Sequence, residues 1–332
     1  MKTWIDEIMD SPRRVAIPIM THPGIEAIGK RVIDAVKDGQ THYEAIRYVV
    51  DHYNTYACSV IMDLTVEAEA FGCEIGFPEN EVPNVLNRLV CDEASVDALQ
   101  VPALHTARVP EYLRANQLAV THITNRPTFA GCIGPFSLAG RLFDMSEIMV
   151  SIYMEPHVIH ALLEKCTQFI LDYCRELKRI GTTGVIMAEP AAGLLPNDEC
   201  NAFSTDYIRR IVEELQDDSF TIILHNCGNQ GQCTEAMLAS GAKALHFGNA
   251  IDLVQVLRDS PENILIMGNI DPVQIMKQAT PEVVRQTTLD LLNNTRTYPN
   301  FVLSSGCDVP PHTPEVNLHA FFEALEIYNQ NL

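Results

Sequence analysis

Three residues of this chain could together hold a metal ion, because they are one histidine and two cysteines. His225 and Cys227 stand two apart in the segment 224–228 (LHNCG), and Cys307 stands in the segment 304–308 (SSGCD). One imidazole and two thiolates suit zinc, and three protein ligands leave a fourth position open for chemistry. The residue types and spacing therefore predict a catalytic zinc site, although other soft divalent ions suit the same ligands.

Each of these segments continues a short apolar run that is typical of a buried β-strand. Within a strand, residues two apart point to the same side and lie about 6.6 Å apart. His225 and Cys227 can therefore bind one ion, and Cys307 can complete the site if its strand lies close to theirs. The alternative is a core histidine with two inert buried cysteines.

Eight apolar, β-branched runs recur along the chain and predict eight strands, most of them separated by helical stretches. Strands that alternate with helices imply a parallel sheet. Eight such units predict an α/β fold of the (β/α)8 TIM-barrel type, with an insertion after the second strand. An open doubly wound sheet is the alternative. The predicted strands cover residues 15–20, 58–64, 128–133 (or 119–124), 184–188, 220–225, 244–247, 264–268 and 301–304, and the clearest helices cover 154–180, 205–215, 281–294 and 314–329.

The barrel interpretation also predicts where the metal ligands lie. In such barrels the chemistry takes place at the C-terminal ends of the strands. His225 and Cys227 end the fifth predicted strand and Cys307 ends the eighth, so all three fall on that face. We expect the acidic, loop-like insertion from residue 67 to about 117 to cover one face of the barrel. We expect residues 1–332 to form a single domain.

Three carboxylates at predicted strand ends are further candidate site residues. Glu189 ends the fourth strand, and we expect it to be a displaceable fourth ligand or to position the substrate. The alternative is a carboxylate that caps a helix or binds a backbone amide. Asp63 and Glu67 follow the second strand and could line the opening, where Asp63 could accept hydrogen bonds from a substrate N–H. The alternative for both is an ordinary acidic loop.

Four other residues near predicted strand ends have simpler interpretations. Asp271 is predicted to be the N-cap of the following helix. His246 lies inside the sixth strand and is interpreted as a core histidine. Cys233 lies on a helix-like stretch and is not counted as a ligand, and His312 is interpreted as a residue of the proline-rich loop after Cys307.

Composition excludes several classes of function. The chain has 23 basic and 43 acidic residues and a net charge of −20, which disfavours non-specific nucleic-acid binding. No apolar run approaches 18 residues, so we expect no membrane span. The ten cysteines are scattered, many of them inside apolar runs, and the first residues lack the apolar stretch of a secretory signal. We therefore expect a cytoplasmic protein with reduced thiols.

With these motifs in view, the chain resembles the uroporphyrinogen decarboxylase superfamily, and within it the corrinoid-dependent branch of the methylcobamide:coenzyme M methyltransferases. The shared motifs are His-x-Cys-Gly at 225–228, Met-Gly-Asn-x-Asp-Pro at 267–272 and Ser-x-Gly-Cys-x-x-Pro-Pro-x-Thr-Pro at 304–314. The segments 66–72 and 134–140 also resemble that branch. The resemblance extends from residue 13 to about 324.

The resemblance implies a (β/α)8 barrel in which the residues matching His225, Cys227 and Cys307 bind zinc. It also implies transfer of a methyl group between a methylcobalamin-type corrinoid and a small thiol such as coenzyme M or homocysteine. Metal coordination deprotonates a thiol, so the hypothesis is attack by a zinc-bound thiolate on the methyl group. No Asp-x-His-x-x-Gly corrinoid motif occurs in the chain, so the corrinoid is expected on a separate carrier protein.

The decarboxylase branch matches less well. Its members carry an Arg-Gln-Ala-Gly-Arg segment after the first strand, whereas residues 20–30 here contain no arginine. Asp63 does match the decarboxylase aspartate that contacts pyrrole N–H groups. Two alternatives therefore stay open: a metal-free decarboxylase of a tetrapyrrole or related acid, and a non-catalytic zinc-dependent protein that binds a thiol or a corrinoid.

Overall fold

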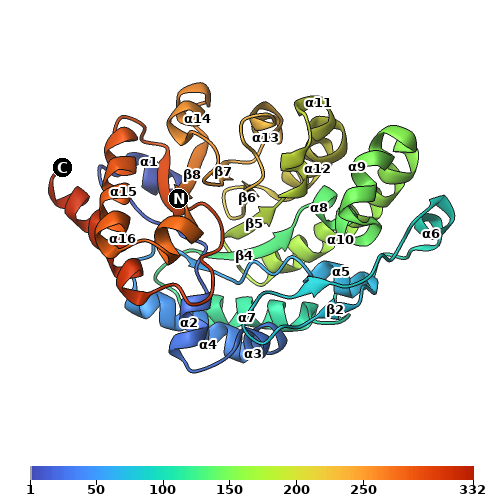
Figure 1. Cartoon of the computed structure of the whole chain (residues 1–332), viewed down its shortest axis with the longest axis horizontal. Coiled ribbons are helices and arrows are strands. Elements are labelled where there is room, and N and C mark those ends of the chain that lie inside the picture. Colours follow the sequence, from blue (N-terminus) through green and yellow to red (C-terminus); the bar gives the residue numbers. More distant parts are fainter. Residues whose placement is uncertain (1) are drawn as a thin grey trace.

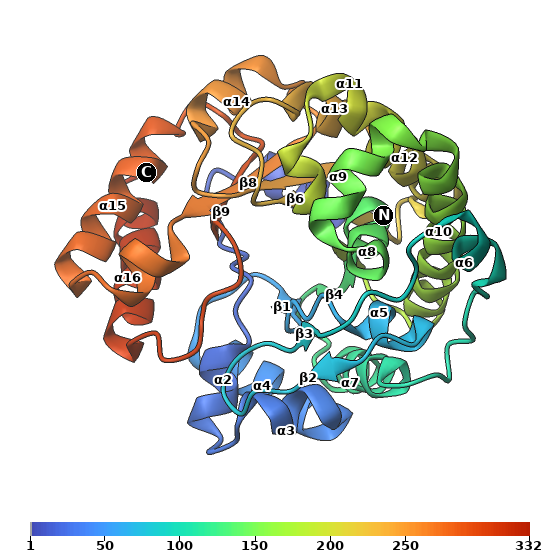
Figure 2. The ribbon, with the colours of Figure 1, turned by 45° about the vertical axis from the view of Figure 1, so that its right-hand side comes forward.

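The computed structural model describes residues 2–332 and contains a curled parallel sheet surrounded by helices (Figures 1 and 2). Seven strands form this sheet, and every neighbouring pair in it is parallel. The arrangement confirms the predicted TIM-barrel-like α/β fold. In spatial order the strands are β1 (Cys58–Ser59), β4 (Thr128–Ile133), β5 (Gly184–Ala188), β6 (Thr221–Asn226), β7 (Ala244–Phe247), β8 (Leu265–Ile270) and β9 (Phe301–Ser305).

The prediction of a regular first strand at residues 15–20 was wrong. This segment makes one isolated parallel bridge, between Ala16 and Leu303 of β9. On its other side the carbonyl of Ala16 accepts a hydrogen bond of 2.8 Å from the amide of Tyr56, just before β1. Pro18 has no N–H group and therefore interrupts any longer ladder. The segment nevertheless fills the place between β9 and β1.

The second predicted strand is shorter than expected, because the ladder of β1 has only two residues. Beyond it the backbone binds side chains instead of a neighbouring strand. The amide of Ile61 donates to Nε2 of His42 at 3.1 Å, and the amide of Met62 donates to Asp308 Oδ2 at 3.2 Å. The other six predicted strands are confirmed, with ends that shift by at most two residues.

Helices surround the sheet, as Figure 2 shows. The predicted helix 154–180 is confirmed as one continuous helix, which begins at Pro156, two residues later than expected, and ends at Arg179. The helices are α1 (Trp4–Asp10), α2 (His22–Ala27), α3 (Val32–Lys37), α4 (Gly39–His52), α5 (Val66–Phe71), α6 (Glu93–Ala98), α7 (Val109–His122), α8 (Pro135–Phe143), α9 (Met145–Met154), α10 (Pro156–Arg179), η1 (Ala191–Leu194), α11 (Asn197–Cys200), η2 (Asn201–Thr205), α12 (Asp206–Leu215), α13 (Thr234–Ala239), α14 (Leu253–Asp259), η3 (Pro272–Lys277), α15 (Pro281–Asn294) and α16 (Glu315–Gln330).

The segment predicted as a loop-like insertion contains regular structure. It holds most of α5, an antiparallel pair formed by β2 (Ile75–Gly76) and β3 (Asn84–Val85), the helix α6, and the first part of α7. The stretches between these elements are irregular, so the loop-like character predicted for the insertion applies to the connections and not to the whole segment. Residues 119–124, the second choice for the third strand, belong largely to α7.

Side chains of the strands alternate between two apolar layers. Ile186, Ile223 and Val302 belong to a buried cluster inside the curled sheet. Val185 and Leu224, one position away, belong to the larger cluster between the sheet and the helices. Because successive residues of a strand point to opposite faces, this alternation decides which strand-end residues face the interior.

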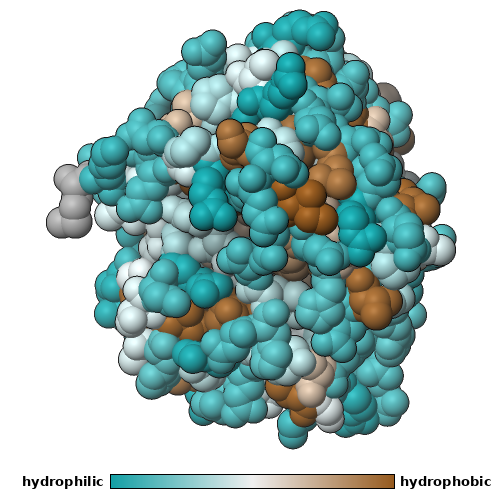
Figure 3. Space-filling view, turned by 90° about the vertical axis from the view of Figure 1, so that its left-hand side faces the viewer, coloured by the Kyte–Doolittle hydropathy of each residue, from teal (hydrophilic) through white to brown (hydrophobic). Residues whose placement is uncertain are grey.

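Within residues 2–332, no helix combines the length and the apolar character that crossing a membrane requires. Figure 3 shows one face of the molecule, on which hydrophilic residues cover most of the area. Hydrophobic residues on this face form small separate groups, as expected for an ordinary protein surface.

Candidate metal centre

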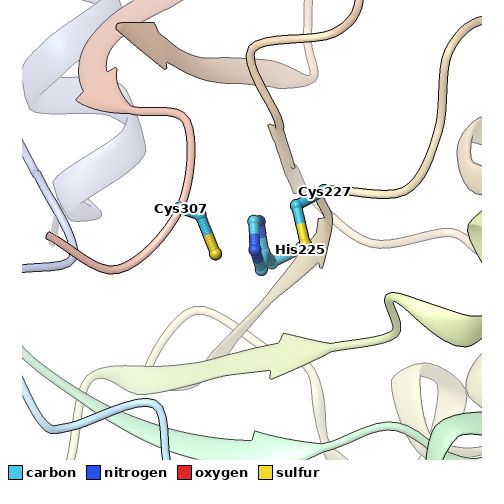
Figure 4. Close-up of side chains that lie close together, drawn as sticks. All are labelled: His225, Cys227 and Cys307. Carbon is cyan, nitrogen blue, oxygen red and sulfur yellow. The ribbon is translucent and has the colours of Figure 1, made fainter. Parts of the chain in front are cut away.

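The three predicted ligands meet at the C-terminal ends of the strands. His225 lies near the end of β6, Cys227 lies just after it, and Cys307 follows β9. Their ligand atoms all lie within 4.8 Å of one another, and Figure 4 shows the side chains turned toward a common point. His225 is buried, whereas both cysteines are partly exposed. The group is therefore exposed to solvent mainly through its two cysteines.

A chain of hydrogen bonds determines the tautomer of His225. The hydroxyl of Ser304 donates to the carbonyl of Ile17 at 2.7 Å, so its oxygen accepts from His246 Nε2, also at 2.7 Å. Burial holds the pKa of His246 well below its usual value, so this ring is neutral and its Nδ1 is an acceptor. Nδ1 of His225, 2.8 Å away, therefore carries a proton and donates it to that acceptor.

The remaining nitrogen of His225 is left with a free lone pair. Nε2 is buried and has no hydrogen-bond partner among the described residues. A buried polar atom without a partner is costly and calls for an explanation. A divalent metal ion between this nitrogen and the two sulfurs would satisfy it, and the donor set of one imidazole and two thiolates fits zinc.

The backbone around Cys227 is tightly fixed. Oδ1 of Asn226 accepts hydrogen bonds from the amides of Gly228 at 2.9 Å and Asn229 at 3.0 Å, which shapes the turn after the ligand. Behind it, a Cβ atom on Gly248 would lie 2.7 Å from the Cα of Cys227. The close packing at Gly248 therefore requires glycine, and any larger residue would displace the ligand.

The segment of Cys307 is fixed by contacts with three other parts of the sheet. The amide of Gly306 donates to the carbonyl of Ile270 at 2.7 Å, and the amide of Val309 donates to the carbonyl of Ile19 at 2.8 Å. Asp308 accepts from the amide of Met62 at 3.2 Å. These bonds hold the segment after β9 at the C-terminal ends of the strands, where the Cys307 sulfur lies within 4.8 Å of the ligand atoms of His225 and Cys227.

The two sulfurs are electrostatically coupled. The pKa of Cys227 is lowered to about 4, chiefly because the Cys307 thiol donates a hydrogen bond to its sulfur, with a further contribution from His225. Cys227 is therefore a thiolate at neutral pH. A thiolate is the form that binds a metal ion.

A cavity of about 740 Å³ opens above the three ligands. Three parts of the chain form its wall: the ends of the strands, the loop between β2 and β3, and the proline-rich loop after Cys307. Part of the insertion thus covers the site, as predicted. Besides the ligands, the lining residues are His22, Met62, Leu64, Pro78, Glu79, Asn80, Glu81, Val82, Ala188, Pro190, Lys277, Asp308, Pro310, Pro311 and His312.

Glu189 does not face this cavity. Ala188 belongs to the interior cluster and Pro190 lines the cavity, so Glu189 between them points the other way. Its Oε1 accepts from the amide of Ser137 at 2.7 Å, and its Oε2 lies against Gly134. Of the two predicted roles, the structure shows the carboxylate that binds a backbone amide and not the displaceable ligand.

The same alternation turns Asp63 away from the cavity. Met62 and Leu64 line the cavity, whereas the carboxylate of Asp63 faces the opposite side. It accepts hydrogen bonds from Arg108 Nη1 at 2.5 Å and the hydroxyl of Tyr112 at 2.7 Å. Its side chain is fully buried. The structure therefore shows a buried ion pair where the sequence suggested a substrate contact.

Glu67 is also buried away from the cavity. It lies on α5, and its Oε1 accepts from the amide of Ile133 at 3.0 Å, at the end of β4. Burial raises the pKa of this carboxyl to about 7. The structure thus brings together the three predicted metal ligands and leaves the three predicted carboxylates behind the cavity wall.

The simpler interpretations of the other residues agree with the geometry. Asp271 accepts from the amides of Val273 and Gln274 and so caps η3. Cys233 is fully buried and stands outside the metal-ligand group. His312 lines the cavity, and its Nδ1 lies 3.0 Å from Oε1 of Glu26.

Sequence reasoning missed four residues of the site. It recognised His246 only as a core residue and did not consider Ser304, although both contribute to the bonds that orient His225. Lys277 and His22 line the cavity as well. His246 could have been found, because it stands opposite His225 when β6 and β7 pair in parallel. Lys277 lies outside any strand, and no local pattern places it in the cavity.

Comparisons with known proteins agree with the motifs. Residues 12–328 match the uroporphyrinogen decarboxylase (URO-D) family. Methylcobamide:CoM methyltransferase MtbA of Methanosarcina acetivorans is 27% identical over 276 residues, which are 82% of this chain and 80% of that protein. A uroporphyrinogen decarboxylase of Coxiella burnetii is 26% identical over 285 residues, which are 82% of this chain and 77% of that protein.

A solved structure shows the same fold over the whole chain. A methyltransferase from Methanosarcina mazei superposes with a TM-score of 0.88 at 18% sequence identity, and the match covers 99% of each chain. The family match extends over nearly all of the chain and agrees with this fold. The chain therefore belongs to the uroporphyrinogen decarboxylase family.

Proposed function

We propose that this protein is a zinc-dependent methyltransferase that moves a methyl group between a corrinoid, presented by a carrier protein, and a small thiol. The observation that carries the proposal is the convergence of two cysteine sulfurs and the unpartnered Nε2 of His225 at the floor of an open cavity. The relatives that are named as methylcobamide:CoM methyltransferases support it.

The ligand set explains how the thiol would react. A zinc ion bound here would lower the pKa of a thiol in its open position, so that the thiol enters as a thiolate. His225 contributes no charge and the two cysteines contribute two negative charges, so electron density stays on the incoming sulfur. The corrinoid would supply the methyl group. Formation of the carbon–sulfur bond would then break the carbon–cobalt bond and leave its electron pair on cobalt.

The surroundings of the cavity suit a partner that docks from outside. A cavity of about 740 Å³ can hold a small thiol, whereas a corrinoid macrocycle must approach from the open side. The carrier protein would therefore cover the C-terminal ends of the strands, next to the loop between β2 and β3. All ten cysteines are free, and we place the protein in the cytoplasm, where thiols stay reduced.

The alternative function is that of a decarboxylase. Some relatives of this chain are named as decarboxylases, but the residues that line the cavity do not suit a substrate with several carboxylates. Asp63 matches the aspartate expected to contact a pyrrole, yet its carboxylate is bonded to Arg108 and Tyr112 behind the cavity wall. Among residues 2–332, Lys277 is the single lysine or arginine that lines the cavity, whereas a substrate with several carboxylates calls for a cluster of them.

The test uses purified protein whose zinc content has been measured. Methylcobalamin is mixed with a thiol, and loss of methylcobalamin absorbance and formation of the methyl thioether are followed together. We expect thioether only with zinc-loaded protein, loss of activity after chelation, and recovery when zinc is restored. Decarboxylation of a porphyrinogen acid by metal-free protein would overturn the proposal. Binding of a thiol without any thioether would instead support the non-catalytic alternative.

A further inference from the structure

A second, smaller cavity of about 250 Å³ adjoins the one above the candidate metal ligands. Leu64 and Pro190 line both cavities, so the two share a wall. Among residues 2–332, Arg141 is the single charged residue that lines the smaller cavity, and the other lining residues are Ser137, Met145, Ala191 and Leu194. The site thus continues beyond the larger cavity, which alone can hold a small thiol.

The guanidinium of Arg141 has no partner in the protein. Arg141 lies in the last turn of α8 and is partly buried. Within residues 2–332, no carboxylate oxygen lies within 4.0 Å of the guanidinium, and its side chain makes no hydrogen bond. Burial lowers the pKa of Arg141 below its ordinary value. A cation suits the end of a helix, but this placement does not supply the hydrogen bonds that a partly buried guanidinium lacks.

The carboxylates around Arg141 bind other groups. Asp63 accepts a hydrogen bond of 2.5 Å from Nη1 of Arg108. Asp144 lines a shallow pocket on the other side of Arg141, where it accepts from two amides at the start of α9 at 2.8 Å and 3.2 Å. The donors of Arg141 are therefore available to a ligand that enters the smaller cavity.

The wall that carries Leu194 is packed against the turn after the candidate ligand Cys227. A Cβ atom on Gly193 would lie 2.3 Å from Oδ1 of Asn226 and 2.5 Å from the carbonyl carbon of Gly228. This close packing fixes the smaller cavity relative to the metal ligands. Leu194 itself is 65% exposed, so it offers apolar surface to a partner at the mouth of the cavity.

A corrinoid has the chemistry that these residues fit. The edge of its ring carries methyl groups and amide side chains, so it presents apolar surface together with carbonyl oxygens. A guanidinium has only donors, which suit such oxygens. The ring is much wider than a small thiol. A corrinoid whose methyl group faces the larger cavity must therefore cover the surroundings as well, and the smaller cavity begins at Leu64 and Pro190.

We propose that the smaller cavity binds the edge of the corrinoid, with Arg141 donating hydrogen bonds to the carbonyl oxygen of a peripheral amide and Leu194 contacting the ring edge. This inference rests on the proposed function and specifies how its corrinoid is oriented. Arg141 is then a positioning residue: it sets the rotation of the ring above the thiol and takes no part in the bond changes. A hydrogen bond from a charged donor is stronger than one between neutral groups.

The experiment measures the dissociation constant of free methylcobalamin by isothermal titration calorimetry, without thiol, on zinc-loaded and on zinc-free protein. We expect Arg141→Met to raise this constant about tenfold in both forms, as the loss of one charge-assisted contact allows. Arg141→Lys keeps the charge but loses the planar fork of donors, so its constant should lie between the two. Leu194→Ala, at an exposed position, should raise the constant less than Arg141→Met does.

Controls separate corrinoid binding from a structural role of Arg141. Arg13 is exposed and precedes the segment that runs parallel to β9, so it lies at the opposite ends of the strands, and Arg13→Met should bind methylcobalamin as the wild type does. Zinc-loaded Arg141→Met should keep the wild-type affinity for 2-mercaptoethanol, because Arg141 does not line the larger cavity. Since the guanidinium has no partner to lose, Arg141→Met should not lower the free energy of unfolding in urea. A clear loss of stability would show a structural role and contradict the inference.

Methylcobinamide distinguishes the two kinds of acceptor that a corrinoid offers, since it keeps the peripheral amides and lacks the phosphate of the nucleotide. We expect Arg141→Met to weaken its binding as strongly as that of methylcobalamin. If the effect is confined to methylcobalamin, the guanidinium binds the phosphate and the proposed amide contact is wrong.

Failure of this inference is distinguishable from failure of the proposed function. If Arg141→Met binds methylcobalamin as tightly as the wild type, or if the wild type binds none, Arg141 does not hold the corrinoid, although methyl transfer by the wild type would still uphold the proposed function. If methylcobalamin binds with the expected dependence on Arg141 but no thiol is methylated, the proposed function fails while the corrinoid site stands.

Discussion

Nδ1 of His246 lies 2.8 Å from Nδ1 of His225, so that one histidine orients another across two neighbouring strands. The two residues are direct partners in the parallel pairing of β6 and β7. Because His246 accepts at this nitrogen, His225 must present Nε2 to the cavity side. The tautomer of a metal-binding histidine is commonly set in this way by the partner of its other nitrogen.

The first prediction concerns this chain of hydrogen bonds. Ser304→Ala removes the acceptor of His246 Nε2 and leaves the tautomer of His246 undetermined, whereas His246→Phe removes the partner of His225 altogether. We expect His246→Phe to weaken zinc binding by about 10- to 100-fold and Ser304→Ala to weaken it less. Competition with a chromophoric chelator measures the affinity.

Ser305→Ala is the matched control, because the Ser305 hydroxyl accepts from the amide of Ile19 at 3.2 Å and does not contact the histidines. It should retain the wild-type zinc affinity. Equal affinities in Ser304→Ala, His246→Phe and the wild type would show that the orientation of His225 does not depend on His246.

The second prediction concerns the metal content. Cys307→Ser replaces one soft sulfur ligand by a hydroxyl, and we expect elemental analysis to find near-stoichiometric zinc in the wild type and little in the variant. Cys233→Ser is the control, since Cys233 is buried outside the ligand group. Absence of zinc from the wild type after zinc has been added back would remove the basis of the proposed mechanism.

Much of the fold and the convergence of His225, Cys227 and Cys307 could be predicted from the sequence, because they depend on local patterns. His225 and Cys227 are two apart, and the period of a strand puts them on one side whichever face that is. The four predicted helices and six of the strands follow from apolar periodicity. The first strand could not be placed reliably, since Pro18 lies inside an apolar run that otherwise reads as a strand.

The roles of Glu189 and Asp63 could not be predicted, because the sequence does not show to which side of the sheet each side chain points. Both lie at strand ends, and their neighbours are apolar on either side. Strands of a parallel sheet are buried on both faces, so their residues form continuous apolar runs that do not reveal which positions face the interior. The structure shows that Ala188 and Met62 face inward, which turns both carboxylates outward.

The third prediction concerns the dependence of stability on pH. Burial raises the pKa of Glu67 from its ordinary value of 4.5 to about 7 in the folded protein. Between these values the unfolded chain releases the proton while the folded protein keeps it, so stability falls as pH rises and levels off above about pH 7. The loss is on the order of 3 kcal/mol at most.

Glu67→Gln imitates the protonated carboxyl, and it should remove this part of the pH dependence. Urea unfolding at several pH values from 5 to 8 measures the free energy of unfolding of the wild type and of the variant. The contributions of other titratable groups cancel when one is subtracted from the other. The exposed Glu147→Gln serves as the control. Parallel pH profiles of wild type and Glu67→Gln would contradict a raised pKa at Glu67.

The fourth prediction distinguishes a structural from a catalytic role for Asp63. Asp63→Ala leaves the guanidinium of Arg108 buried, with 8% of its side chain exposed, and leaves it Glu69 at 2.5 Å as its remaining carboxylate partner. Loss of one partner of a buried ion pair costs about 3–5 kcal/mol, and the retained contact with Glu69 should keep the cost toward the lower end of that range. The exposed pair of Arg210 and Glu164 offers a control, since Glu164→Ala should cost at most about 1 kcal/mol.

Urea unfolding measures these changes, and calorimetry on the folded variant measures thiol binding. Because Asp63 lies behind the cavity wall, we expect Asp63→Ala to lower the free energy of unfolding while the thiol dissociation constant of the folded protein stays within about twofold of the wild type. Arg108→Met in the Asp63→Ala background should restore part of the lost stability, since the charge then left without a partner is that of Glu69, whose side chain is 21% exposed and can be solvated. A variant that keeps full stability but loses thiol binding would instead place Asp63 in the substrate site.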